Sequence, residues 1–152
     1  TCDTILEQVE FTYDAGGNLI ETVTRQRYQN APASQTGELK NPSETPKARV
    51  TYSASYPDAL GRTVATANYG TNGGTALVRS STIPAGSDNV LVSTTAYDSA
   101  GNRESSTDPS GMVTSYEHDD RGRETQRIMN PVTSSSSSSK KRGSGWRPLG
   151  GS

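Results

Sequence analysis

Few residues of this 152-residue chain are of the types that carry out catalysis. The single histidine, His118, is followed directly by Asp119 and Asp120, and these three could supply an acid–base pair. A metal site built on two imidazoles is excluded because the chain has one His. The local pattern favours a structural interpretation, with His118 in a strand and Asp119 in the turn that follows. We therefore expect a protein that is not an enzyme, with no catalytic residue.

Metal and cofactor sites are also not expected. Asp88-Asn89 and the span from Asp98 to Asn102 offer oxygen ligands for calcium, but no Asp-x-Asp-x-Asp-Gly loop is present. The glycine-rich segment 70–74 lacks the Lys-Ser/Thr pair of a phosphate-binding loop, so a flexible loop is the simpler interpretation. We expect no metal and no cofactor.

Charge and hydropathy exclude further classes of partner. A net charge of −1, with no basic stripe interleaved with aromatic residues, argues against nucleic acid. No run of apolar residues is long enough for a membrane span, and residues 1–20 show no signal-peptide pattern. Cys2 is the single cysteine, so it indicates no compartment.

One short phrase recurs four times along the chain: an aromatic residue, Asp, two variable residues, Gly, and then Asn or Arg. The clearest copies read FTYDAGGN at 11–18 and TAYDSAGN at 95–102. A third, YEHDDRGR at 116–123, has His118 before its Asp, and a fourth, YPDALGR at 56–62, has Pro57 as an extra residue. The residues that define the copies are Tyr13, Asp14, Gly17 and Asn18; Tyr56, Asp58, Gly61 and Arg62; Tyr97, Asp98, Gly101 and Asn102; and Tyr116, His118, Asp119, Gly122 and Arg123.

The spacing of the phrase indicates a repeat. Its glycines are separated by 44, 40 and 21 residues, which predicts a period of about 20 to 22 residues with two further copies hidden by divergence or insertion. Residues 37–39 and 72–74 are the candidates for these hidden copies.

Elements that alternate with a period of two surround each phrase. Val9, Phe11 and Tyr13 share one face of a predicted strand, and the segment 50–56 behaves in the same way. Each Asp can form an Asx turn, and each Gly can adopt positive φ. A second turn type is predicted where Asp108, Pro109 and Gly111 join two copies. We predict an all-β fold of antiparallel β-hairpins stacked into a curved open sheet.

Composition suggests how the chain divides. Apolar residues make up 29% of the chain, so we expect a thin sheet with one solvent-exposed face and a small core. Residues 1–130 form the predicted repeat segment, and 31–48, with three prolines, is a predicted exposed insertion. The serine- and lysine-rich residues 131–152 are predicted to be a disordered tail.

The phrase resembles the YD repeats of Rhs-type proteins, a family that includes shell subunits of toxin complexes and the teneurins. The resemblance is carried by 13–18, 97–102 and 119–123, and the segment 107–111 with Tyr116 resembles the turn between repeats in that family. It implies a hairpin sheet that spirals into a hollow shell around a C-terminal toxin, or that displays a cell-surface face. It also implies a secreted or cell-surface location, with other YD repeats or a toxin payload as partners.

Two alternatives remain open beside a structural role in such a shell. The seven tyrosines, with Asn side chains nearby, could form a shallow platform for carbohydrate or a cell surface, although they suit the face of a sheet equally. The chain could also be a truncated fragment with no function of its own.

Overall fold

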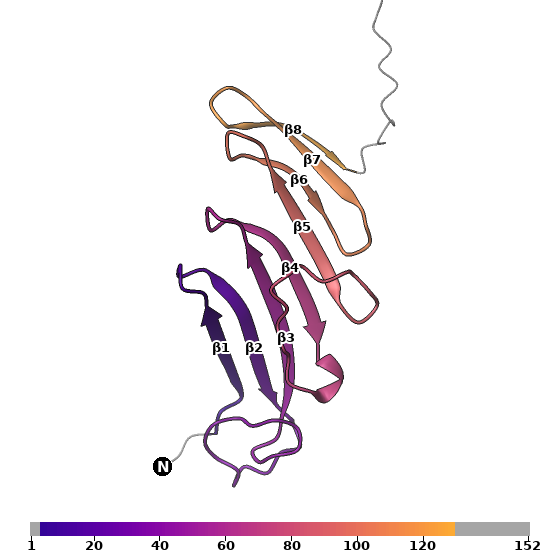
Figure 1. Cartoon of the computed structure of the whole chain (residues 1–152). Helices are drawn as coiled ribbons and strands as arrows, with labels where there is room; N and C mark the ends of the chain where they lie inside the picture. The colour runs from indigo at the N-terminus through magenta and orange to yellow at the C-terminus, as the bar shows by residue number, and fades with distance from the viewer. Residues whose placement is uncertain (1–3, 130–152) are drawn as a thin grey trace, which may run out of the picture.

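The computed structural model describes residues 4–129 and is all-β apart from a short 3-10 turn, η1 (Asn72–Gly74). Eight strands form one antiparallel sheet in which every strand pairs with its neighbours in chain order (Figure 1). The prediction of antiparallel hairpins in an open sheet is confirmed, and the predicted tail at 131–152 lies outside the described residues. The strands are β1 (Glu7–Tyr13), β2 (Leu19–Arg27), β3 (Ala48–Pro57), β4 (Thr63–Gly70), β5 (Leu91–Tyr97), β6 (Arg103–Thr107), β7 (Val113–His118) and β8 (Glu124–Met129).

The four copies of the phrase are the turns of four successive hairpins, β1–β2, β3–β4, β5–β6 and β7–β8. Their turns follow one another along the same side of the sheet (Figure 1). The prediction of two hidden copies is therefore wrong. Residues 37–39 lie in the connection from β2 to β3, and 72–74 lie in the connection from β4 to β5. The uneven gaps between the glycines arise because these two connections, at the other end of the strands, are long.

The two faces of the sheet differ in what covers them. Directly paired residues of antiparallel strands lie on the same face, so the register assigns every strand residue to a face. The covered face carries Tyr52, Ala54 and Tyr56 of β3. The open face carries Phe11, whose partner Thr22 pairs in turn with Ser53. In β3 the two faces give a regular alternation of buried and more exposed residues.

The core lies on the covered face of β3 and β4. Ala54, Tyr56, Ala65 and Ala67 form a buried cluster, against which Tyr69, Val90 and Val92 pack. Alanines leave room above this face, and the connection 71–90 crosses in front of it (Figure 1). The tyrosines of β1 and β3 thus differ in solvent exposure. Tyr56 is 3% exposed, whereas Tyr13, on the open face of the first strand, is 57% exposed.

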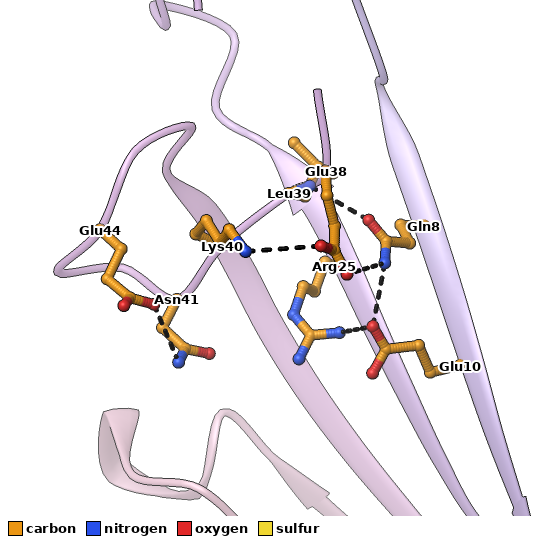
Figure 2. A network of polar contacts seen from close by, with 8 residues as sticks. All are labelled: Gln8, Glu10, Arg25, Glu38, Leu39, Lys40, Asn41 and Glu44. Carbon is orange, nitrogen blue, oxygen red and sulfur yellow. Dashed lines mark hydrogen bonds and ion pairs between the residues drawn. The ribbon is translucent and has the colours of Figure 1, made fainter. Parts of the chain in front are cut away.

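The connection from β2 to β3 is anchored to the sheet, although most of its residues are exposed. Leu39 is 1% exposed, and its backbone N–H donates to Oε1 of Gln8 on β1 at 3.1 Å. The Gln8 amide also donates to Glu10 and Glu38, and Arg25 pairs with Glu10 at 2.6 Å (Figure 2). The predicted exposed insertion at 31–48 therefore contains a buried anchor, and its last residue already belongs to β3.

Candidate functional site

The hairpin turns are five-residue loops with one shared pattern of backbone hydrogen bonds. The Asp N–H donates to the carbonyl of the residue four positions later, and the Gly N–H donates to the Asp carbonyl, at 2.8–3.0 Å. The same sequence phrase thus produces the same local structure each time. The four turns are Asp14–Asn18, Asp58–Arg62, Asp98–Asn102 and Asp119–Arg123.

The aspartate side chain closes each turn from within. Its Oδ1 accepts the N–H groups of the second and fourth following residues at 2.8–3.0 Å. The glycine of each turn has φ between +75° and +89°, a region that costs other residues about 1–2 kcal/mol. The Asp and the Gly of the phrase are therefore both required by the backbone.

The last residue of the phrase binds the second carboxylate oxygen, Oδ2. Asn18 and Asn102 donate their amides to the Asp of their own turn at 3.0 and 3.1 Å. Arg62 and Arg123 donate from Nε at 2.8 Å, and a further guanidinium nitrogen of each makes an ion pair with the same oxygen. Asn and Arg alternate at this position because each has an N–H that reaches Oδ2.

These contacts hold the pKa of each turn aspartate below the ordinary Asp value. The main cause is the side-chain hydrogen bond from Asn18 for Asp14, from Arg62 for Asp58 and from Asn102 for Asp98. For Asp119 the main cause is the backbone N–H of Arg123. The carboxylates are held ionised as turn acceptors, which is not the state of a general acid. The structural interpretation of these aspartates is therefore the one the geometry supports.

The predicted turn at Asp108, Pro109 and Gly111 is present between β6 and β7, but the prediction that it is of a second type is wrong. Asp108 makes the same backbone bonds with Gly111 and Met112 as the other four turns, and its Oδ1 accepts the same two N–H groups. It differs in two respects: it joins β6 to β7 at the other end of the strands, and the side chain of Met112 has no N–H to donate to Oδ2. The hydroxyl of Ser110 donates to Asp108 instead, at 2.6 Å, and is the main cause of the lowered Asp108 pKa.

Pro57 is not an extra residue in its copy. The register of each hairpin shifts just before the residue that precedes the turn Asp, and in this hairpin that residue is Pro57. Pro57 therefore occupies the position of the phrase tyrosine, while Tyr56 faces the core. The sequence signal was present but ambiguous, because Tyr56 and Pro57 are adjacent. The equivalent residues of the other hairpins are Tyr13, Tyr97 and His118.

Successive turns pack on one another through the same two positions. The last side chain of one turn lies against the glycine of the next, so closely that in two cases a Cβ on that glycine would lie under 3.0 Å from it. We call this series of contacts the turn ladder. Its contacts, given as distances from an ideal Cβ on the glycine, are Asn18 to Gly61 at 2.7 Å, Arg62 to Gly101 at 3.7 Å and Asn102 to Gly122 at 2.9 Å.

Arg62 also reaches the tyrosine of the next hairpin. Its guanidinium lies 4.4 Å from the ring centroid of Tyr97, and the Tyr97 hydroxyl donates to the carbonyl of Thr63 at 3.1 Å. A cation over a tyrosine face contributes about 0.5–1 kcal/mol at an exposed site. The phrase tyrosine is therefore a contact between hairpins, made on the open face.

Tyr116 is the centre of a second cluster on the open face. The guanidiniums of Arg103 and Arg127 lie 5.1 and 5.2 Å from its ring centroid, and its hydroxyl lies 3.1 Å from that of Ser106. The Ser106 and Arg103 hydrogen bonds lower the Tyr116 pKa. This cluster ties together β6, β7 and β8, which have no buried core of their own within the described residues.

Arg79 is a structural residue that the sequence pattern missed. It lies in the connection over the core, stacks on Tyr56 at 4.5 Å and donates to the carbonyl of Ser55 at 2.8 Å. Burial, together with a hydrogen bond to Tyr69, raises the pKa of Tyr56 to about 12. An arginine in an irregular loop has no periodicity, so its role is visible only in three dimensions.

Four of the candidate chemical residues, Asp98, His118, Asp119 and Asp120, line one open pocket between neighbouring turns. Within residues 4–129, no group of three or more His, Cys, Asp or Glu side chains is placed to hold a metal ion. His118 occupies the tyrosine position of its hairpin, and Asp98 and Asp119 are engaged in their turns. In the same part of the chain, no helix is long and apolar enough to cross a bilayer.

Comparison with known proteins agrees with the repeat pattern. Residues 97–129 match the family described as RHS Repeat, a span that runs from the last residue of β5 to the last residue of β8. The search of curated proteins found no match. The turns at 14–18 and 58–62 lie outside the matched span but have the same hydrogen bonds as those within it. The same hydrogen-bonded turn thus occurs in all four hairpins.

Proposed function

We propose, from the premise that this chain belongs to the Rhs/YD-repeat family, that it is a non-catalytic structural segment of a larger β-sheet wall. The observation that carries the proposal is the turn ladder. The contacts that join one hairpin to the next are made by the last residue of one phrase and the glycine of the next. Each added repeat therefore contains the residues that attach it to its neighbour. In repeat proteins, stability is a sum of units and of interfaces between neighbours.

The finer role that we propose for this wall is enclosure or surface display. A twisted sheet that extends by identical steps curves as it grows, which suits a shell around a payload such as a toxin domain or a wall at the cell surface. Its partners are then further YD repeats and the enclosed payload, and its location is secreted or at the cell surface, as the family resemblance implies.

Insertion of one additional repeat tests the structural proposal. A second copy of residues 103–123, placed after Arg123, supplies two strands and two turns, one at each end of the strands, in the order of the existing repeat. We expect the extended protein to gain β content by circular dichroism and to melt at a higher temperature. The control is an insertion with the same 21 residues in scrambled order, which should add neither. An intact repeat that raises neither quantity would contradict the proposal.

A second candidate is contact with carbohydrate, and the observation that favours it is the exposure of aromatic rings on β1. Phe11 and Tyr13 are 55% and 57% exposed on the open face. The phrase asparagines do not add to this platform, because Asn18 and Asn102 donate their amides to turn aspartates. Glycan-array binding that disappears in Tyr13→Ala but persists in Tyr28→Ala would support this candidate, and an array without binding would reject it.

A further inference from the structure

Neighbouring hairpins pair in one constant register. At each of the three junctions, the residue three positions after one turn is opposite the residue four positions before the next turn Asp. A register repeated three times in strands of unlike sequence reflects the geometry of the turn ladder rather than particular side-chain pairs. The three pairs are Glu21 with Ala54, Ala65 with Thr94, and Ser105 with Ser115.

At each junction, the type of residue that ends one turn corresponds to the type of residue that precedes the Asp of the next turn. Arg62 ends its turn and meets Tyr97, the phrase tyrosine of the next hairpin, at 4.4 Å. Where the next hairpin has Pro57 or His118 at that position, the preceding turn ends in the shorter Asn. A long cation therefore precedes a tyrosine, and a short amide precedes another residue.

Both ends of the turn ladder are open within the described residues. No atom lies within 4 Å of a Cβ built on Gly17, and Tyr13 beside it is 57% exposed. At the other end Arg123 pairs with Asp119, but its side chain remains 72% exposed. In residues 4–129, β1 and β8 each have a strand partner on one side. Such free edges are sites at which further strands add.

We propose that copies of this chain associate head to tail, with β8 of one copy pairing antiparallel with β1 of the next. Arg123 then lies over Tyr13 and Gly17 of the next copy, as Arg62 lies over Tyr97 and beside Gly101. The two open ends repeat the pairing of Arg62 with Tyr97, because the fourth turn ends in Arg123 and the first phrase has Tyr13. The inference rests on the wall proposed above and specifies its partner as a second copy.

The constant register fixes which residues meet. Gln126 is three positions after Arg123, and Glu10 is four before Asp14, so these two residues are opposite each other in the docked pair. Both belong to the covered face, since Gln126 pairs with Glu117 and Glu10 pairs with Val23. A one-residue slip would bring opposite faces together, so the agreement of faces is a requirement that this register meets.

The docked edge also covers apolar surface that is exposed in one copy. In this register Phe11 is opposite Thr125, and Val9 is opposite Arg127, whose aliphatic stem can cover it. Because a head-to-tail contact leaves one free edge on each end copy, association continues into a ring or a filament.

Cysteine cross-linking between two variants of the full chain tests the register. In a Cys2→Ser background, a Gln126→Cys chain is mixed with a Glu10→Cys chain under mild oxidation. Directly opposite residues have Cα atoms about 4.5–5.5 Å apart, which a disulfide can span. Thr12→Cys in place of Glu10→Cys is the matched control. Thr12 lies on the same face of β1 as Glu10 but two residues further along the strand, so it is not opposite Gln126 in the proposed register. We expect the in-register mixture to give at least about fivefold more heterodimer than the control.

Substitution of the docking arginine supplies an independent readout. Arg123→Glu should weaken self-association by at least tenfold in sedimentation velocity, whereas Arg121→Glu makes the same charge change in the same turn and should leave it unchanged. Circular dichroism establishes that both variants are folded. A chain that stays monomeric at millimolar concentration, equal cross-linking to Glu10→Cys and Thr12→Cys, or equal effects of the two arginine variants would overturn the proposal. A monomeric chain that still gains stability from an inserted repeat would reject self-association and leave the wall intact.

Discussion

The aspartate, the glycine and the last residue of each phrase have separable tasks. The aspartate binds two backbone N–H groups, the glycine adopts a positive φ, and the last residue donates to the aspartate carboxylate and, in the first three copies, packs on the next turn. The phrase is therefore at once a local turn signal and a contact between hairpins. The second task could not be predicted from the sequence, because it depends on which turns become neighbours.

Glycine substitutions separate these tasks. Gly17→Ala should cost about 1–2 kcal/mol for its positive φ alone, because a Cβ there meets no atom within 4 Å. Gly61→Ala should cost about 0.5–1.5 kcal/mol more, because its Cβ would displace Asn18, which then loses a hydrogen bond to Asp14. Urea unfolding measures both free energies of unfolding.

A double-mutant cycle checks the contact itself. Asn18→Ala combined with Gly61→Ala should be less destabilising than the sum of the single changes, because the crowding side chain is gone. Asn18→Ala combined with Gly101→Ala should be additive within about 0.5 kcal/mol, since Gly101 faces Arg62. Equal additivity in the two pairs would show that the turns do not pack as described.

The turn aspartates also predict how stability depends on pH. Their folded-state pKa values are lowered, so the unfolded chain binds protons first as the pH falls. The stabilisation is fully present above the ordinary Asp value of 3.8 and is lost as the pH falls below it, through the folded-state values. Thermal melting should be flat near neutral pH and fall below about pH 4. Asp98→Asn should lessen that fall, because it removes one of these carboxylates; a curve equal to that of the unchanged protein would contradict the assignment.

Among the elements, strands and turns were more predictable than connections. Alternation located strands correctly, since Val9, Phe11 and Tyr13 lie in β1 and the segment 50–56 lies in β3. The connections could not be interpreted in this way because their anchors, Leu39 and Arg79, have no periodic context. Proline-rich and glycine-rich composition correctly indicated loops but gave no indication that both loops pack on the sheet.

Arg79 should be the residue that holds the connection 71–90 over the core. Arg79→Ala removes a stacking contact with Tyr56 and a charged hydrogen bond to Ser55, with an expected loss of about 1–3 kcal/mol in the free energy of unfolding. Hydrogen exchange in 71–90 should rise. Arg49→Ala, on an exposed position of β3, is the control and should stay within about 0.5 kcal/mol. Unchanged exchange in Arg79→Ala would contradict the role.

For the whole molecule, the sequence correctly indicated an all-β repeat fold and led to the wrong count of repeats. The period of about 20 to 22 residues was drawn from one short gap, and two long connections were mistaken for hidden copies. The structure replaces that count with four successive hairpins whose mutual register is constant. A chain with so small a core depends on these junctions, because an isolated hairpin is marginally stable in water.

The central claim is that four hairpins join into one sheet with the same register at every junction, and cross-strand nuclear Overhauser effects test it most directly. Backbone contacts should appear between Glu21 and Ala54, between Ala65 and Thr94, and between Ser105 and Ser115. Contacts confined to the two strands of each hairpin, or junction contacts displaced differently from one junction to the next, would contradict it.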